Sequence, residues 1–184
     1  MRGEKGFTLS ELLVAMVVAG LVMTATYATY MTQTRAYKTN EAVTALQQNL
    51  RAAMYFLERD LRMAGYNPSV SKTVNFGFTN IGTSNVKVTM DSNGNGLLDP
   101  NQGEEITYAR DAANNILKRD AGKGAGAQML ALDITAFTLA YLDANGATTA
   151  SADAVRSVDI SLTASDGKHT RTLATRVRCR NMCL

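Results

Sequence analysis

A nearly uninterrupted apolar run from Phe7 to about Thr26 limits what this chain can fold into. The run has the roughly 20 residues that a helix needs to cross a lipid bilayer. One carboxylate, Glu11, interrupts it. An ionisable side chain inside a membrane costs roughly 2.5–3.5 kcal/mol on insertion scales, so such a residue usually marks a function. Arg2 and Lys5 precede the run, which predicts a cytoplasmic N-terminus by the positive-inside rule.

The helix predicted for this run continues beyond the length of a membrane. Apolar residues recur every three or four positions from Val43 to Ala64, which is typical of a helix with one buried face. They are Val43, Leu46, Leu50, Ala53, Met54, Leu57, Leu61 and Ala64. Residues 7–66 contain no proline, and Gly65 is typical of a helix C-terminus. We therefore expect one helix over residues 7–66, roughly 85 Å long, of which residues 7–26 lie in a membrane or a filament core.

After the helix, the sequence changes to short alternating runs separated by turn residues. Alternation predicts strands at residues 85–90, 105–110, 115–118, 134–142, 157–165 and 170–179. Turn residues occur at Asp143–Gly146 and at Asp166-Gly167. The strands fit an antiparallel sheet packed on the second half of the helix. We therefore expect an α+β fold with a β-rich globular head over residues 67–184.

The residues around Gly6 match a known processing signal. The segment Gly6-Phe7-Thr8-Leu9-Ser10-Glu11-Leu12 resembles the cleavage site of type IV prepilins and of type II secretion pseudopilins. The resemblance implies that residues 1–6 are a leader, which prepilin peptidase removes by cutting after Gly6. It also implies N-methylation of Phe7 and the ladle fold of type IV pilins. A secretory signal peptide fits less well because the apolar run is too long, and a plain anchor leaves Glu11 unexplained.

The same resemblance implies that Glu11 is an assembly residue. After cleavage, Phe7 carries an ammonium group at the edge of an apolar environment. A carboxylate four residues along the helix can approach this group, in its own subunit or in a neighbour. Such an ion pair offsets part of two desolvation costs and favours one axial register between helices. The implied partners are other pilin subunits, prepilin peptidase, the membrane and the inner-membrane assembly platform.

A second resemblance concerns the end of the helix. The segment Arg59-Asp-Leu-Arg-Met-Ala-Gly-Tyr66 resembles minor prepilins of the W type, and similar segments occur in J-type minor pseudopilins. The leading interpretation is a structural minor pilin that initiates or stabilises pilus assembly, at or near the tip. The alternatives are a J-type pseudopilin of type II secretion and an adhesive or DNA-uptake pilin. The precursor is expected in the inner membrane with a periplasmic head, and the mature subunit in a filament at the cell surface.

The loop after the first predicted strand has the start of a calcium-binding pattern. Asp91, Asn93, Asn95 and Gly96 match the first half of a calcium loop, but the twelfth position is Gln102. The candidate oxygen ligands are Asp91, Asn93, Asn95, Asp99 and Glu104. The alternative is a polar hairpin loop, in which Asn-Gly pairs supply positive φ angles. Any calcium bound here is expected to be structural and weakly held.

The C-terminus leaves two further alternatives open. Cys179 and Cys183 could form a disulfide if the chain turns between them, or could be small apolar side chains at the end of a strand. Arg176, Arg178 and Arg180 alternate along the last strand. We interpret them as a charged edge that discourages pairing with other strands, and the alternative is contact with a neighbouring subunit or an anionic surface.

The composition argues against catalysis and against strong binding to nucleic acid. His169 is the single histidine of the 184 residues, and no nucleophile elbow, phosphate loop or zinc motif occurs. The net charge of +3 is small for a chain of this length, so no specific nucleic-acid partner is predicted. The sequence therefore predicts a structural protein and not an enzyme.

Overall fold

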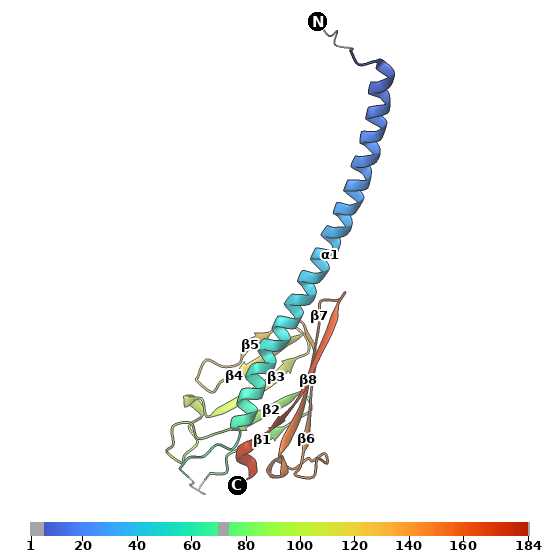
Figure 1. The fold of residues 1–184 in the computed structure, drawn as a ribbon. Coiled ribbons are helices and arrows are strands. Elements are labelled where there is room, and N and C mark those ends of the chain that lie inside the picture. The colour runs from blue at the N-terminus through green and yellow to red at the C-terminus, as the bar shows by residue number, and fades with distance from the viewer. Residues whose placement is uncertain (1–5, 70–73, 184) are drawn as a thin grey trace. The chain divides into compact units, whose positions relative to one another are not determined.

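The computed structural model describes residues 6–69 and 74–183 (Figure 1). These residues form one long helix, α1 (Leu9–Met63), followed by short strands and three short 3₁₀ helices. The strands are β1 (Phe78–Ile81), β2 (Asn85–Thr89), β3 (Glu105–Asp111), β4 (Ile116–Asp120), β5 (Gln128–Ala131), β6 (Ile134–Leu142), β7 (Ser157–Ser165) and β8 (Thr170–Arg178). The 3₁₀ helices are η1 (Pro100–Gln102), η2 (Ala152–Ala154) and η3 (Arg180–Cys183). The α+β fold class predicted from the sequence is confirmed.

The chain divides into two compact units between Ala42 and Val43. In the first unit, residues 6–30 all have exposed side chains. This part of α1 is apolar around its whole circumference; Leu12, for example, is 56% exposed. Such a helix needs a lipid or protein environment to cover it.

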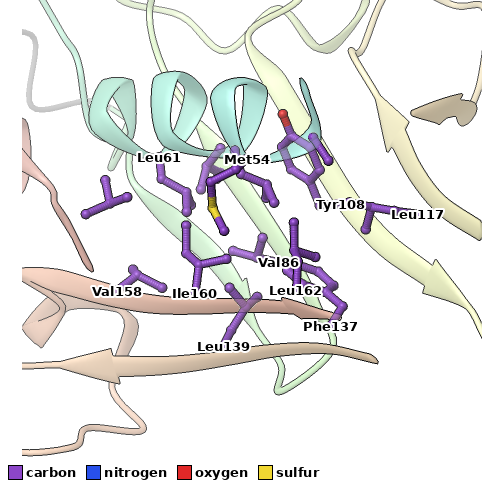
Figure 2. Close-up of a cluster of buried hydrophobic side chains, with 14 of the residues drawn as sticks. Met54, Leu61, Val86, Tyr108, Leu117, Phe137, Leu139, Val158, Ile160 and Leu162 are labelled. Carbon is purple, nitrogen blue, oxygen red and sulfur yellow. The ribbon is translucent and has the colours of Figure 1, made fainter. Parts of the chain in front are cut away.

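The second unit contains the hydrophobic core. The predicted stripe of α1 is confirmed, since its members from Leu46 to Ala64 are buried, and Val43 is half-buried. Met54 and Leu61 point from α1 toward apolar side chains of the strands, among them Val86 and Ile160 (Figure 2). The strands contribute residues of both sheets to this one core.

All strands pair with antiparallel neighbours, but they form two sheets and not the single sheet that was expected. One sheet has the order β1-β2-β3-β4-β5, and the other has the order β6-β7-β8. Isolated backbone hydrogen bonds join β6 to turns of the first sheet: Leu139 N–H donates to Thr83 O at 2.9 Å, and Ile134 N–H donates to Asn115 O at 2.8 Å. Among the described strands no ladder joins the two sheets, and β6 and β8 are the edges of the three-stranded sheet.

The end of α1 is fixed by the C-terminal turn. The helix ends at Met63, three residues before the expected position, and Gly65 follows with a φ of +78°. The Gly65 N–H donates to Thr89 O at 3.0 Å, and Asn181 Nδ2 donates to the carbonyl of Arg62 at 3.2 Å. These bonds satisfy backbone groups that a helix end would otherwise leave unpaired.

Candidate functional site

Thr8 and Glu11 close the N-terminal end of α1 by bonding to each other. Glu11 Oε2 accepts hydrogen bonds from the backbone N–H of Thr8 at 2.9 Å and from its hydroxyl at 2.7 Å. The Glu11 N–H lies 3.4 Å from Thr8 Oγ1. This is the geometry of a capping box, which satisfies helix N–H groups that have no partner in the helix. The Thr-x-x-Glu pattern of a capping box is visible in the sequence. An assembly role for Glu11 was predicted from the sequence, and this cap was not.

Gly6 and Phe7 lie in non-helical chain directly before this cap. The Phe7 side chain is 84% exposed. The bond between the two residues is therefore outside the helix. If this bond is cut, the new ammonium group of Phe7 is one residue away from the N–H that Glu11 already binds. The Glu11 carboxylate thus lies next to Phe7, the residue on which the sequence predicts a positively charged ammonium group after cleavage.

A shallow hollow of about 620 Å³ lies beside Glu11 on the surface of α1. Glu11, Ala15 and Ala19 line it at a spacing of four residues, so they share one face of the helix. Small residues at this spacing let a second helix approach closely in an apolar environment. This face of α1 therefore combines a charge with a surface suited to helix packing.

Threonine hydroxyls are satisfied within the helix that follows. Thr24 Oγ1 donates to Gly20 O at 2.8 Å, and Thr34 Oγ1 donates to Tyr30 O at 2.9 Å. Thr26, Thr29 and Thr32 make the same bond to the carbonyl four residues earlier. A hydroxyl that is bonded in this way can enter a dry environment at low cost. The part of α1 that tolerates apolar surroundings therefore extends beyond Thr26.

In the second unit, one buried carboxylate ties α1 to the five-stranded sheet. Asp60 is 3% exposed, and its Oδ2 accepts hydrogen bonds from Tyr108 Oη at 2.7 Å and from Arg119 Nε at 2.8 Å. Burial, together with the charge of Asp60, raises the pKa of Tyr108 well above its ordinary range. Asp60 lies next to the apolar stripe and carries no sequence signal of its own. Its role in the structure is to join secondary-structure elements.

The structure brings the five predicted calcium ligands into one loop. Asp91 and Glu104 are fully buried, and their carboxylates accept hydrogen bonds from loop N–H groups: Gly96 N–H donates to Asp91 Oδ2 at 2.9 Å, and Ser92 N–H donates to Glu104 Oε1 at 3.0 Å. Asp99 Oδ2 accepts bonds from the side-chain amides of Asn93 and Asn95. Among the described residues, no three acidic, histidine or cysteine side chains converge as metal ligands. Calcium binding therefore stays a prediction of the sequence.

The remaining C-terminal predictions have mixed outcomes. Cys179 is buried at the end of β8, while the side chain of Cys183 lies outside the described part of the structure, so the disulfide stays a prediction. Arg176 and Arg178 lie on the exposed face of β8, and Arg180 follows in η3. The chain turns between the last two arginines, so the expected single strand over residues 170–179 ends at Arg178.

Comparisons with known families agree with this geometry. Among the described residues, α1 is the one helix that is long and apolar enough to cross a membrane. The N-terminal residues 1–27 match the family model of the prokaryotic N-terminal methylation motif. Residues 39–179 match the family model of prepilin peptidase-dependent protein B. A search of the curated proteins gives no match. Both models describe structural subunits of the prepilin kind and not enzymes, and because the second covers most of the chain, the chain belongs to the prepilin peptidase-dependent protein B family.

Proposed function

We propose that this chain is a minor subunit of a type IV pilus, which acts in initiating or stabilising filament assembly at or near the tip. In this proposal prepilin peptidase cuts between Gly6 and Phe7, and Phe7 is then N-methylated. The observation that carries the proposal is the position of Glu11. Its carboxylate is held at the N-terminal end of an apolar helix whose residues up to Tyr30 are all exposed.

Two physical requirements support a filament as the final environment of α1. A helix that is apolar on all sides is stable in lipid, but lipid does not offer a partner to Glu11. A neighbouring helix does, since its own N-terminal ammonium can pair with the carboxylate. The alanines next to Glu11 allow that neighbour to approach. The subunit therefore gains an ion pair and close packing together when it leaves the membrane for a bundle of helices.

The precursor in this proposal is anchored in the inner membrane by residues 7–26, with its head in the periplasm. Its partners are prepilin peptidase, the assembly platform of the inner membrane and other pilin subunits. The choice of a pilus over a type II secretion system rests on the W-type segment from Arg59 to Tyr66. A J-type pseudopilin would share the N-terminal site. Neighbouring genes for a pilus retraction motor would support the pilus, and genes for the full secretion machine would support the pseudopilin.

The experiment that tests the assembly role compares two glutamates of the same helix. Glu11→Ala removes the carboxylate of the N-terminal site, and Glu41→Ala removes an exposed carboxylate further along α1. Both variants are expected to insert in the membrane. Only Glu11→Ala is expected to be depleted from filaments sheared from the cell surface, as measured by immunoblot against the membrane fraction. Equal amounts of the two variants in the filaments would contradict the proposed role of Glu11.

The cap complicates this experiment, because Glu11→Ala also removes the bonds to Thr8. Thr8→Val serves as the second control, since it removes the hydroxyl partner and retains the carboxylate. If helix capping alone explained the loss, Thr8→Val would reduce incorporation as much as Glu11→Ala. We expect Thr8→Val to stay close to the parent chain.

A further inference from the structure

Four arginine side chains line one hollow of about 460 Å³ in the second unit. Arg176 and Arg178 come from β8, Arg180 comes from η3, and Arg62 comes from the last turn of α1. The hollow therefore gathers guanidinium groups from elements that are far apart in the sequence. Within residues 6–69 and 74–183, no other side chain contributes to its lining.

Two of the four arginines have carboxylate partners, and the other two have none among the described residues. Arg176 binds Asp159 with both Nε and Nη2, at 2.5 and 2.8 Å, and Arg62 Nη2 lies 3.0 Å from Glu58. The side chains of Arg178 and Arg180 make no hydrogen bond or ion pair with any residue that the structure describes. The hollow thus retains two positive charges that the described part of the chain does not balance.

Arginine makes this charge permanent. A lysine in a crowded basic cluster can lose its proton, but the guanidinium group of arginine stays charged in proteins. The mutual repulsion of the guanidinium groups is therefore relieved only by solvent, by salt or by a bound anion. A bound anion relieves it most where the groups surround a hollow and do not point apart.

The number of donors favours a phosphate group over a carboxylate. A single arginine already satisfies a carboxylate here, since Arg176 binds both oxygens of Asp159. A carboxylate presents only two oxygens, which lie in one plane, so it offers fewer acceptors to guanidinium groups that line a hollow. A tetrahedral phosphate presents three or more oxygens, so it can accept paired bonds from several guanidinium groups at once. We propose that this hollow is a binding site for a phosphate group, either free or in the backbone of a nucleic acid.

Two further hollows share arginines with this one. Arg62 and Arg180 also line a hollow of about 530 Å³, to which Arg59 adds a guanidinium group and Tyr55 an exposed ring. Arg176 and Arg178 also line a hollow of about 770 Å³, to which Arg156 adds a guanidinium group beside Asp143. The basic lining therefore continues beyond the first hollow, and the tyrosine ring offers a surface on which a base can stack. A local site of this kind is compatible with the small net charge of the chain, and it does not depend on the assembly role of Glu11.

The test uses the full-length chain in detergent and two variants of the same region. Arg178→Gln combined with Arg180→Gln removes the two guanidinium groups that lack a partner. Arg171→Gln is the matched control, because Arg171 is an exposed arginine of β8 that does not line the hollow. One probe is inorganic phosphate, measured by the shift of the thermal unfolding midpoint against chloride at equal ionic strength. The other is a labelled single-stranded DNA of about ten nucleotides, measured by fluorescence anisotropy.

The proposal predicts that at least one probe binds, that the double variant weakens it about tenfold or more, and that Arg171→Gln leaves it unchanged. Binding of inorganic phosphate identifies a free anion as sufficient, and binding of the oligonucleotide alone identifies the nucleic-acid backbone. For the oligonucleotide, affinity should fall as salt is raised, with a slope of log K against log salt of about −0.7 for each phosphate bound.

Three results would overturn the proposal. The first is that neither probe binds the parent chain. The second is that Arg171→Gln weakens binding as much as the double variant, which would indicate general attraction to a basic surface. The third is tighter binding of a polyglutamate peptide than of either probe, which would assign the hollow to an acidic protein segment.

Discussion

The hydroxyl of Tyr108 donates a 2.7 Å hydrogen bond to Oδ2 of Asp60, although the two residues are 48 positions apart. Arg119 Nη2 lies 2.7 Å from the same oxygen. Asp60 is on α1, Tyr108 is on β3, and Arg119 is on β4, so one carboxylate joins three elements of the head. Both Asp60 and Tyr108 are buried, so water cannot hydrogen-bond to them in the folded state. Their contact with each other supplies the hydrogen bond instead.

The first prediction concerns the unequal cost of removing each partner. Asp60→Ala leaves the guanidinium of Arg119 without its carboxylate and the hydroxyl of Tyr108 without its acceptor, so it should lower the free energy of unfolding by about 3 kcal/mol or more. Tyr108→Phe removes one donor and leaves the ion pair intact, so it should cost only about 1 kcal/mol. Urea unfolding of the detergent-solubilised chain, followed by circular dichroism, measures both. A loss of similar size in the two variants would contradict the central position of Asp60.

The second prediction concerns alkaline pH. The pKa of Tyr108 is raised from its ordinary value of 10.0, first by burial and then by Asp60, so the folded state holds its proton when the unfolded state loses it. The stability that this group contributes is present below pH 10 and is lost as the pH rises further. We expect the decline in unfolding free energy above pH 10 to be shallower in Tyr108→Phe. Identical pH profiles for the variant and the parent chain would show that Tyr108 is not held in its neutral form.

The third prediction concerns the glycine after α1. Gly65 has a φ of +78°, and a Cβ added there would lie 2.9 Å from Met182 Sδ. Gly124 has a similar φ of +73° in open space. Gly124→Ala should therefore cost only the backbone strain, about 1–2 kcal/mol, while Gly65→Ala should cost more because it also displaces Met182. Unfolding free energies measure the difference, and Met182→Ala in the Gly65→Ala background should remove most of the excess, leaving the contact with Asn181 O at 3.3 Å. Equal costs for the two alanines would show that η3 does not pack against Gly65.

The fourth prediction concerns the loop between β2 and β3. If it binds calcium as the sequence predicts, isothermal titration of the full-length chain should show a dissociation constant of about 10⁻⁴–10⁻³ M, typical of extracellular modules. Asp99→Asn should abolish the heat, and this half-buried residue can be changed without removing the buried carboxylates of Asp91 and Glu104. If the parent chain gives no heat at millimolar calcium, the calcium prediction is contradicted. That result would support the alternative of a hydrogen-bonded hairpin loop.

Periodicity made most of the fold predictable. The spacing of apolar residues gave the buried face of α1 from Leu46 to Ala64, and alternation gave six of the strands. The strands β1 and β5 were missed because each has only four residues and a bulge in its pairing. Neither strand therefore shows a regular alternation of buried and exposed residues. The division into two sheets was also missed. It depends on which strands pair along their edges, and the alternation of residues within one strand does not determine this.

The candidate site was predictable where the signal is local and was missed where it is not. Glu11 is conspicuous in an apolar run, and its cap with Thr8 follows from residues three positions apart. Asp60 could not be recognised, because its burial depends on Tyr108 and Arg119 from other elements. The arginine hollow was missed for the same reason, since it also depends on contacts between separate elements. The alternation of Arg176 and Arg178 is visible in β8, but the approach of Arg62 requires the folded head.

The intact mass of the chain, extracted from membranes of cells that contain prepilin peptidase, tests the proposed processing most directly. We expect a chain that starts at Phe7 and carries one added methyl group. We also expect that Gly6→Val retains residues 1–6 and lacks the methyl group. A parent chain that keeps its first six residues in the presence of active peptidase would contradict the claim that this N-terminus is processed for assembly.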